Sequence, residues 1–162
     1  MIRPAKPEDA PAIAEIYAHY VETSAVTFEE STPTVEETAE RIASSRLPFL
    51  VAELDGRVRG YAYLSPYIER SAYRHTAQDS VYVAPDARGA GLGRALLEQL
   101  LAEGERAGVK EVVAIIAVTD DPASTKLHRA FGFREAGRLE RVGFKLGRWN
   151  DTLLMQRSLD PR

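Results

Sequence analysis

Residues 80–97 read Ser-Val-Tyr-Val-Ala-Pro-Asp-Ala-Arg-Gly-Ala-Gly-Leu-Gly-Arg-Ala-Leu-Leu, which joins an apolar strand to an amphipathic helix through a glycine-rich turn. The glycines at 89, 91 and 93 can take conformations that are closed to larger residues and let the backbone approach a ligand. The first N–H groups of the following helix have no partner within it, and the helix dipole adds to their preference for an anion. The stretch therefore predicts a cradle for a pyrophosphate.

The spacing of the glycines separates this turn from two other nucleotide motifs. A P-loop needs a lysine after its last glycine, and none follows here. A dinucleotide fingerprint needs Gly-x-Gly-x-x-Gly and an acid at the end of the next strand, but the third glycine comes one residue early and Glu111 precedes that strand. The pattern that remains is Arg88-x-x-Gly91-x-Gly93. On these residues alone, a glycine-rich connection without a ligand stays an alternative.

The composition bounds the class of protein. A chain of 162 residues with 44% hydrophobic and 28% charged residues predicts one globular domain over 1–162. The absence of cysteine excludes disulfides, thiolate metal sites and a cysteine nucleophile. A net charge of -3 with scattered basic residues argues against a nucleic-acid partner. The longest apolar run, Val112 to Val118, is too short to cross a bilayer, and the N-terminus does not resemble a signal peptide, so we expect a cytoplasmic protein without a membrane partner.

Hydrophobic periodicity and turn signals predict the order of elements. The strongest turn signal is Asp55-Gly56, which lies between two apolar runs and predicts an antiparallel hairpin. Val112 to Val118 is a continuous apolar run and predicts a strand buried on both faces. The remaining expected elements are a strand at 1–3, helices from Pro7, at 34–45, at 92–107 and at 123–131, a strand at 76–83, and a terminal antiparallel pair at about 135–142 and 152–158.

This order predicts an α/β fold, a mixed and mostly antiparallel twisted sheet with helices on both faces. With the Arg88-x-x-Gly91-x-Gly93 turn, it resembles the GNAT superfamily of acyl-CoA N-acyltransferases. The resemblance implies that the strands ending near Val83 and Val118 splay apart and that the gap receives the pantetheine arm of acetyl-CoA, without a metal. By the same resemblance, the residues expected to bind the cofactor are Val81, Tyr82, Val83, Arg88, Gly89, Ala90, Gly91, Leu92, Gly93, Arg94, Asp121 and Ser124.

Further segments are similar to the phosphinothricin and methionine sulfone/sulfoximine N-acetyltransferases. They are Ser65 to Thr76, Ser124-x-x-Leu127-His128-x-x-x-Gly132-Phe133, and Val142 to Asp151. The resemblance implies transfer of acetyl from acetyl-CoA to the α-amine of a small amino acid. It leaves other acceptors open, namely a polyamine, another amino acid or a peptide N-terminus.

The same branch implies the substrate-binding residues. Val26-Thr27-Phe28-Glu29 resembles its substrate loop, so Phe28 and Glu29 are expected at the acceptor. Arg70 and Tyr73 lie in the loop that the family uses for the substrate, and an arginine fork pairs well with a carboxylate. Lys145 lies in a terminal segment that, by resemblance, approaches the pocket of a partner subunit, which implies a homodimer. The alternative for that segment is a plain hairpin.

Catalysis needs a group for the amine proton, a donor for the carbonyl and an acid for the thiolate. The family places a glutamate where this chain has Gln78, which cannot accept a proton. The candidates are then Asp79, if a bulge turns it to that side, Glu29, or an ordered water. The backbone N–H of Val83 is the expected carbonyl donor, and His128 is either the acid or a packing residue. Because of Gln78, a non-catalytic acyl-CoA sensor is a further alternative.

Overall fold

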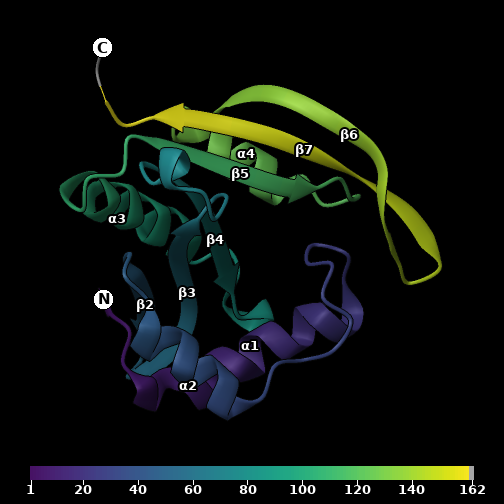
Figure 1. Cartoon of the computed structure of the whole chain (residues 1–162). Coiled ribbons are helices and arrows are strands. Elements are labelled where there is room, and N and C mark those ends of the chain that lie inside the picture. The colour runs from purple at the N-terminus through teal and green to yellow at the C-terminus, as the bar shows by residue number, and fades with distance from the viewer. Residues whose placement is uncertain (161–162) are drawn as a thin grey trace.

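The computed structural model describes residues 1–160, in which the strands form one seven-stranded sheet of order β1-β2-β3-β4-β5-β7-β6 (Figure 1). The β4–β5 pair is parallel and the other pairs are antiparallel, which confirms the expected mixed sheet. The strands are β1 (Ile2–Pro4), β2 (Phe49–Leu54), β3 (Arg57–Pro66), β4 (Thr76–Val83), β5 (Glu111–Ala117), β6 (Arg134–Lys145) and β7 (Arg148–Ser158). The α-helices are α1 (Ala10–Thr23), α2 (Val35–Ser44), α3 (Leu92–Arg106) and α4 (Ala123–Ala130).

Two tight turns fix the hairpins of the sheet. Asp55 and Gly56 have φ of 53° and 74°, the left-handed pair that a two-residue hairpin turn requires, so the β2–β3 prediction is confirmed. Leu146 and Gly147 adopt the same conformation, with φ of 53° and 73°, and close a β6–β7 hairpin that is longer than predicted. The sequence signal was weak there because leucine rarely occupies a left-handed position.

The helices cover both faces of the sheet, as expected. On β4, the ring of Tyr82 contacts Tyr17 and Tyr20 of α1, whereas Asp79 bonds to His128 of α4 on the opposite face. The core packs α3 against the sheet through fully buried side chains, chiefly Leu96, Leu97, Leu100, Val112 and Met155. One strand therefore carries side chains into two separate helical layers.

The prediction that β5 is buried on both faces was wrong. Its burial alternates along the strand, and Ile115 is 41% exposed although Val112 and Ala114 are buried. The physical reason is that one face of β5 lines the cleft described below, where it is not covered by a helix. Within residues 1–160 no helix is both long enough and apolar enough to span a membrane.

Candidate active site

The central feature is a wedge between β4 and β5. Their ladder joins only three pairs of residues, from Thr76–Glu111 to Gln78–Val113, and the strands then diverge (Figure 1). A cleft of about 660 Å³ occupies the divergence. The expected splaying of these strands is thus confirmed.

Two backbone N–H groups of β4 point into this cleft and have no partner in the sheet. The backbone N–H of Ala84 donates to the carbonyl oxygen of Arg59 on β3. In an antiparallel pair, successive residues point their N–H groups alternately toward and away from the neighbouring strand, so those of Val83 and Val81 point away from β3. They face β5 beyond the point where its ladder with β4 has stopped. Two strand N–H groups are therefore available to a ligand in the wedge.

The glycine turn closes one end of the cleft. Gly89 and Gly91 have φ of 87° and 81°, and Gly91 is the N-cap of α3. A Cβ built on either glycine meets no atom within 4 Å, so open space lies in front of this backbone. Free N–H groups facing open space at a helix start suit a pyrophosphate. These residues therefore fit the phosphate portion of a coenzyme A.

Charged side chains frame the mouth of the cleft. Arg88 and Asp121 form an ion pair of 2.7 Å between half-exposed side chains. A bond from the backbone N–H of Ala123 and the pair with Arg88 lower the pKa of Asp121. Arg94 lies over the ring of Phe131, 5.2 Å from its centroid. Leu92 is buried beneath the turn and Ala90 is exposed on it.

A buried carboxylate and a histidine meet on the α4 side of the cleft. His128 Nε2 lies 2.7 Å from Asp79 Oδ2, and His128 Nδ1 lies 2.7 Å from the carbonyl oxygen of Ser124. Because that carbonyl only accepts, Nδ1 carries a hydrogen. The pair of Nε2 and the carboxylate then shares a further proton. Both side chains line the cleft, although Asp79 is 6% and His128 4% exposed.

The surroundings of His128 favour its charged form. Burial lowers the pKa of the ring, but the hydrogen bond and charge of Asp79, with the bond to Ser124, outweigh it and raise the pKa overall. Asp79 Oδ1 has no hydrogen-bond partner in the described chain. The regular β3–β4 register contains no bulge at Asp79. The condition for Asp79 to reach the amine side is therefore not met, and its carboxylate faces α4.

The opposite face of β4 carries Gln78, Ser80 and Tyr82 toward α1. Tyr82 packs edge-on against Tyr17, with ring centroids 5.2 Å apart. Burial raises the pKa of Tyr17 to about 12, so its hydroxyl remains protonated at neutral pH. Tyr20 donates its hydroxyl to the carbonyl oxygen of Val83. The tyrosines on this face are therefore neutral, and the hydroxyl of Tyr20 fixes the end of β4.

The substrate loop is held by the β6–β7 hairpin. Phe28 lines the cleft, and a Cβ on Gly143 of β6 would lie 2.3 Å from its ring, so the glycine permits this contact. Lys145 Nζ donates to the carbonyl oxygens of Ser24 at 2.6 Å and Thr27 at 2.8 Å. Lys145 is 4% exposed, and burial lowers its pKa. Within its own chain, the buried ammonium is thus committed to loop carbonyls, and its expected contact with substrate stays a prediction.

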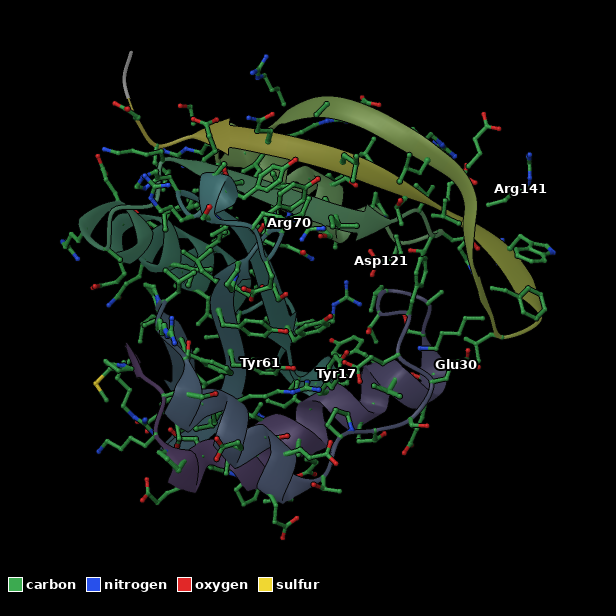
Figure 2. All side chains as sticks on the ribbon, viewed as in Figure 1. Tyr17, Glu30, Tyr61, Arg70, Asp121 and Arg141 are labelled. Atoms are coloured by element: carbon green, nitrogen blue, oxygen red, sulfur yellow. The ribbon has the colours of Figure 1, made fainter. Side chains whose placement is uncertain are left out.

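Two predicted substrate ligands stay in an exposed loop. Arg70 lies on the β3–β4 connection, and its guanidinium has no side-chain partner among residues 1–160 (Figure 2). Tyr73 is 43% exposed and packs edge-on against Tyr67. Neither lines the cleft. The structure thus brings the expected cofactor residues together and leaves this loop available for a ligand from solvent.

Sequence reasoning missed the tyrosines of β3. Tyr61 and Tyr63 stand opposite Tyr82 and Ser80 on the α1 side, and with Phe49 they form a row of stacked rings. The alternation in Tyr-Ala-Tyr at 61–63 was a signal that both rings share one face.

Comparison with known proteins identifies the family. The model of the acetyltransferase (GNAT) domain matches residues 2–154. A phosphinothricin N-acetyltransferase from Alcaligenes faecalis is 49% identical over 98% of this chain and 82% of its own length. An L-methionine sulfoximine/L-methionine sulfone acetyltransferase from Salmonella typhimurium is 38% identical over 98% of this chain and 94% of its own.

Solved structures agree with this assignment. A GNAT phosphinothricin acetyltransferase from Sinorhizobium meliloti, in complex with acetyl-CoA, superposes with a TM-score of 0.94 at 40% identity, covering 98% of this chain and 88% of that one. The structure of yncA from Salmonella typhimurium, with its cofactor acetyl-CoA, superposes with a TM-score of 0.96 at 36% identity, covering 100% of this chain and 95% of that one. Fold, wedge, cradle and relatives together place the chain in the GNAT family of acetyltransferases.

Proposed function

We propose that this enzyme transfers the acetyl group of acetyl-CoA to the α-amine of a small amino acid that carries a phosphinate, sulfone or sulfoximine side chain. The observation that carries the proposal is the wedge, where free strand N–H groups, a glycine cradle and the Asp79–His128 pair open onto one cleft. The names of the relatives support the acceptor class, and the acetyl-CoA complexes of two solved relatives support the donor.

The donor side is formed by backbone groups. Acetyl-CoA supplies an acetyl group on a thioester whose carbonyl oxygen gains negative charge during transfer. The N–H of Val83 is the donor proposed for that oxygen, and such a donor contributes about 3 kcal/mol to transition-state stabilisation. The N–H groups around Gly91 hold the pyrophosphate, with Arg88 beside them.

His128 is the proposed acid for the departing sulfur. Its Nδ1–H is committed to the carbonyl of Ser124, and Nε2 shares a proton with the carboxylate of Asp79. This shared proton is the one that passes to the sulfur in the cleft that both side chains line. Asp79 is a positioning residue, because it orients the ring through Nε2 and favours the protonated form. The parent thiol has a pKa near 8.5, so this acid assists the reaction without being obligatory.

The amine loses its proton on the α1 side of β4. Gln78 cannot accept a proton, whereas Glu29 is a carboxylate on that side, at the edge of the substrate loop. Glu29 receives the proton through a water that Gln78 orients. The neutral amine nitrogen then bonds to the acetyl carbon, and its second proton leaves to solvent through the same water. The carbon–sulfur bond breaks, and the sulfur takes the proton that His128 shares with Asp79.

Release of coenzyme A tests this function directly. Thiol detection with phosphinothricin, methionine sulfone, methionine sulfoximine and a polyamine as acceptors should show turnover with the first three. The N-acetylated product should be found by mass spectrometry. Turnover with the polyamine alone would overturn the acceptor class, and acetyl-CoA binding without turnover on any acceptor would favour a sensor.

We also propose that the enzyme is a homodimer that associates through the β6–β7 hairpin. The hairpin tip exposes a cluster of large apolar side chains, including Phe144 at 54% and Trp149 at 65%, whose rings are 4.8 Å apart. Figure 1 shows this hairpin reaching beyond the rest of the sheet. Light scattering should give twice the mass of one chain, and Trp149→Glu should halve it. A wild-type monomer at assay concentration would contradict the proposal.

A further inference from the structure

A second cavity, of about 610 Å³, lies beside the wedge on the α1 side of the sheet. Its floor is formed by Phe49 of β2 and by Tyr61 and Tyr63 of β3, and its roof includes Tyr17 of α1 and Thr38 of α2. Figure 2 labels Tyr61 and Tyr17, which line it from the sheet and from the helix. The proposed transfer mechanism uses none of these side chains.

The strand register places this cavity next to the amine site. Tyr63 is directly opposite Ser80, and Ser65 is directly opposite Gln78. Ser65 and Tyr63 line the second cavity, whereas Gln78 and Ser80 line the wedge. Neighbouring strands are about 4.8 Å apart. A substrate whose amine lies over β4 therefore reaches the cavity with a side chain of a few atoms.

The cavity is lined by two tyrosines whose hydroxyls make no hydrogen bond within the described chain. Tyr61 is 3% exposed, yet its hydroxyl makes no hydrogen bond within residues 1–160, and the same holds for Tyr63. Burial raises the pKa of Tyr61, so its hydroxyl remains a donor. Neither hydroxyl is sealed inside the protein, and both residues line the cavity, so a ligand oxygen there can accept their hydrogens.

The arrangement of the rings argues against a cationic ligand. Tyr63 stacks on Phe49 with centroids 4.9 Å apart, and Tyr61 stacks on Tyr82 at 5.4 Å. The ring faces, which attract cations, are therefore turned toward each other, and the electropositive edges and hydroxyls remain for the cavity. At the rim, Arg41 is paired with Glu29 at 3.8 Å. The other two charged residues at the rim, Arg46 and Glu69, have opposite charges that sum to zero, so the rim does not attract a cation either.

We propose that this second cavity binds the side chain of the acceptor amino acid, and that the hydroxyls of Tyr61 and Tyr63 select side chains with an apolar stem that ends in hydrogen-bond-accepting oxygens. The inference rests on the proposed function, since it assigns the specificity of that same reaction. Methionine and methionine sulfone are the matched probes, because they differ only in two side-chain oxygens.

The test measures kcat/KM for both probes at saturating acetyl-CoA. The wild-type enzyme should prefer the sulfone, and Tyr61→Phe and Tyr63→Phe should each lower the sulfone-to-methionine ratio about fivefold, the effect of losing one hydrogen bond. The KM for acetyl-CoA and the rate with methionine should stay the same. Tyr67→Phe removes a hydroxyl outside both cavities and is the matched control.

Calorimetric binding of methionine sulfone to the coenzyme A complex separates this inference from the proposed function. Turnover with a ratio that neither tyrosine variant changes would overturn the inference and leave the function standing. Binding of the sulfone that weakens in both variants, without turnover in wild type, would support the cavity and overturn the function. Neither binding nor turnover would overturn both.

Discussion

The two faces of β4 are built in different ways. Toward α4 the strand presents the Asp79 side chain, and the free N–H groups of Val81 and Val83 point toward β5 at the same cleft. The phosphate cradle follows within the same stretch of chain. Toward α1 it presents Gln78 and Ser80, which lie beside a second cavity lined by side chains from α1, α2, β2 and β3. The donor face is mostly local backbone, whereas the acceptor face is assembled from side chains far apart in sequence. This difference predicts that donor binding is fixed by main-chain geometry and acceptor choice by replaceable side chains.

The largest expected effect comes from breaking the donor face at Gly91. Gly91→Val places a branched side chain at φ 81° and in the open space before the helix N–H groups. Loss of two charge-assisted hydrogen bonds to the pyrophosphate should lower kcat/KM for acetyl-CoA by about 1000-fold. Steady-state kinetics and acetyl-CoA titration measure the loss.

Gly56→Val is the matched control for strain. Gly56 has φ 74° and equally open space around a Cβ, but it lies in the β2–β3 turn outside the cleft. Both variants should lose a similar free energy of unfolding, whereas the control should keep the acetyl-CoA KM. Equal losses of acetyl-CoA affinity would show that the cradle contributes only through stability.

The next effect sharpens the role of the Asp79–His128 pair. His128→Gln keeps a hydrogen-bond donor for Asp79 but cannot release a proton, so kcat should fall about 100-fold with acetyl-CoA affinity retained. Asp79→Asn removes the charge that raises the pKa of His128. Because the protonated ring is the acid, kcat should decline at a lower pH in Asp79→Asn than in wild type. An unchanged pH–rate profile would exclude the acid role.

On the acceptor face, Glu29→Gln tests the path of the amine proton. The change should lower kcat/KM for the amino acid about tenfold near pH 7, and the loss should shrink at a pH where the free amine dominates. Glu30→Gln alters an exposed neighbour that lines neither cavity and should behave as wild type. A deficit in Glu29→Gln that is the same at every pH would point to binding instead of proton transfer.

The smallest effect concerns stability. Because the folded protein raises the pKa of His128, its charged pair with Asp79 stabilises the fold fully below the unfolded pKa of about 6.5. This contribution is lost as pH rises through the folded pKa, and it amounts to ~1.4 kcal/mol for every pH unit that separates the folded pKa from the unfolded one. Urea unfolding between pH 6 and 9 should show the loss in wild type and less of it in Asp79→Asn. Identical slopes in both proteins would count against the charged pair.

The difference between the faces also explains what could be predicted from the sequence. The cradle and the end of β4 are contiguous, so the spacing predicted an anion-binding turn there, and the resemblance to the GNAT superfamily implied acetyl-CoA as its ligand. Asp79 and His128 are 49 residues apart, and both were candidates, but their pairing depends on how α4 packs over β4. The pattern of apolar residues indicated the strand and the helix that carry them, but it contains no information on the distance between the two side chains.

The acceptor side was less predictable for the same reason. The resemblance implied that Lys145 approaches the pocket of a partner subunit, and it did not indicate the bonds that Lys145 makes within its own chain to carbonyls 118 to 125 positions away. No local pattern specifies such a contact, because buried backbone carbonyls are revealed only by the tertiary fold. Alternation could place Tyr61 and Tyr63 on one face, but the cavity above them depends on the spacing between α1, α2 and the sheet.

A crystal structure with coenzyme A and methionine sulfone bound together would show directly which ligand each face of β4 binds. We expect the thiol arm between β4 and β5 near His128, the amine over Gln78 and Ser80, and the sulfone oxygens within hydrogen-bond distance of the hydroxyls of Tyr61 and Tyr63. A structure with both ligands on the α4 face of β4, or with the sulfone outside the second cavity, would contradict the division of the site between the two faces of one strand.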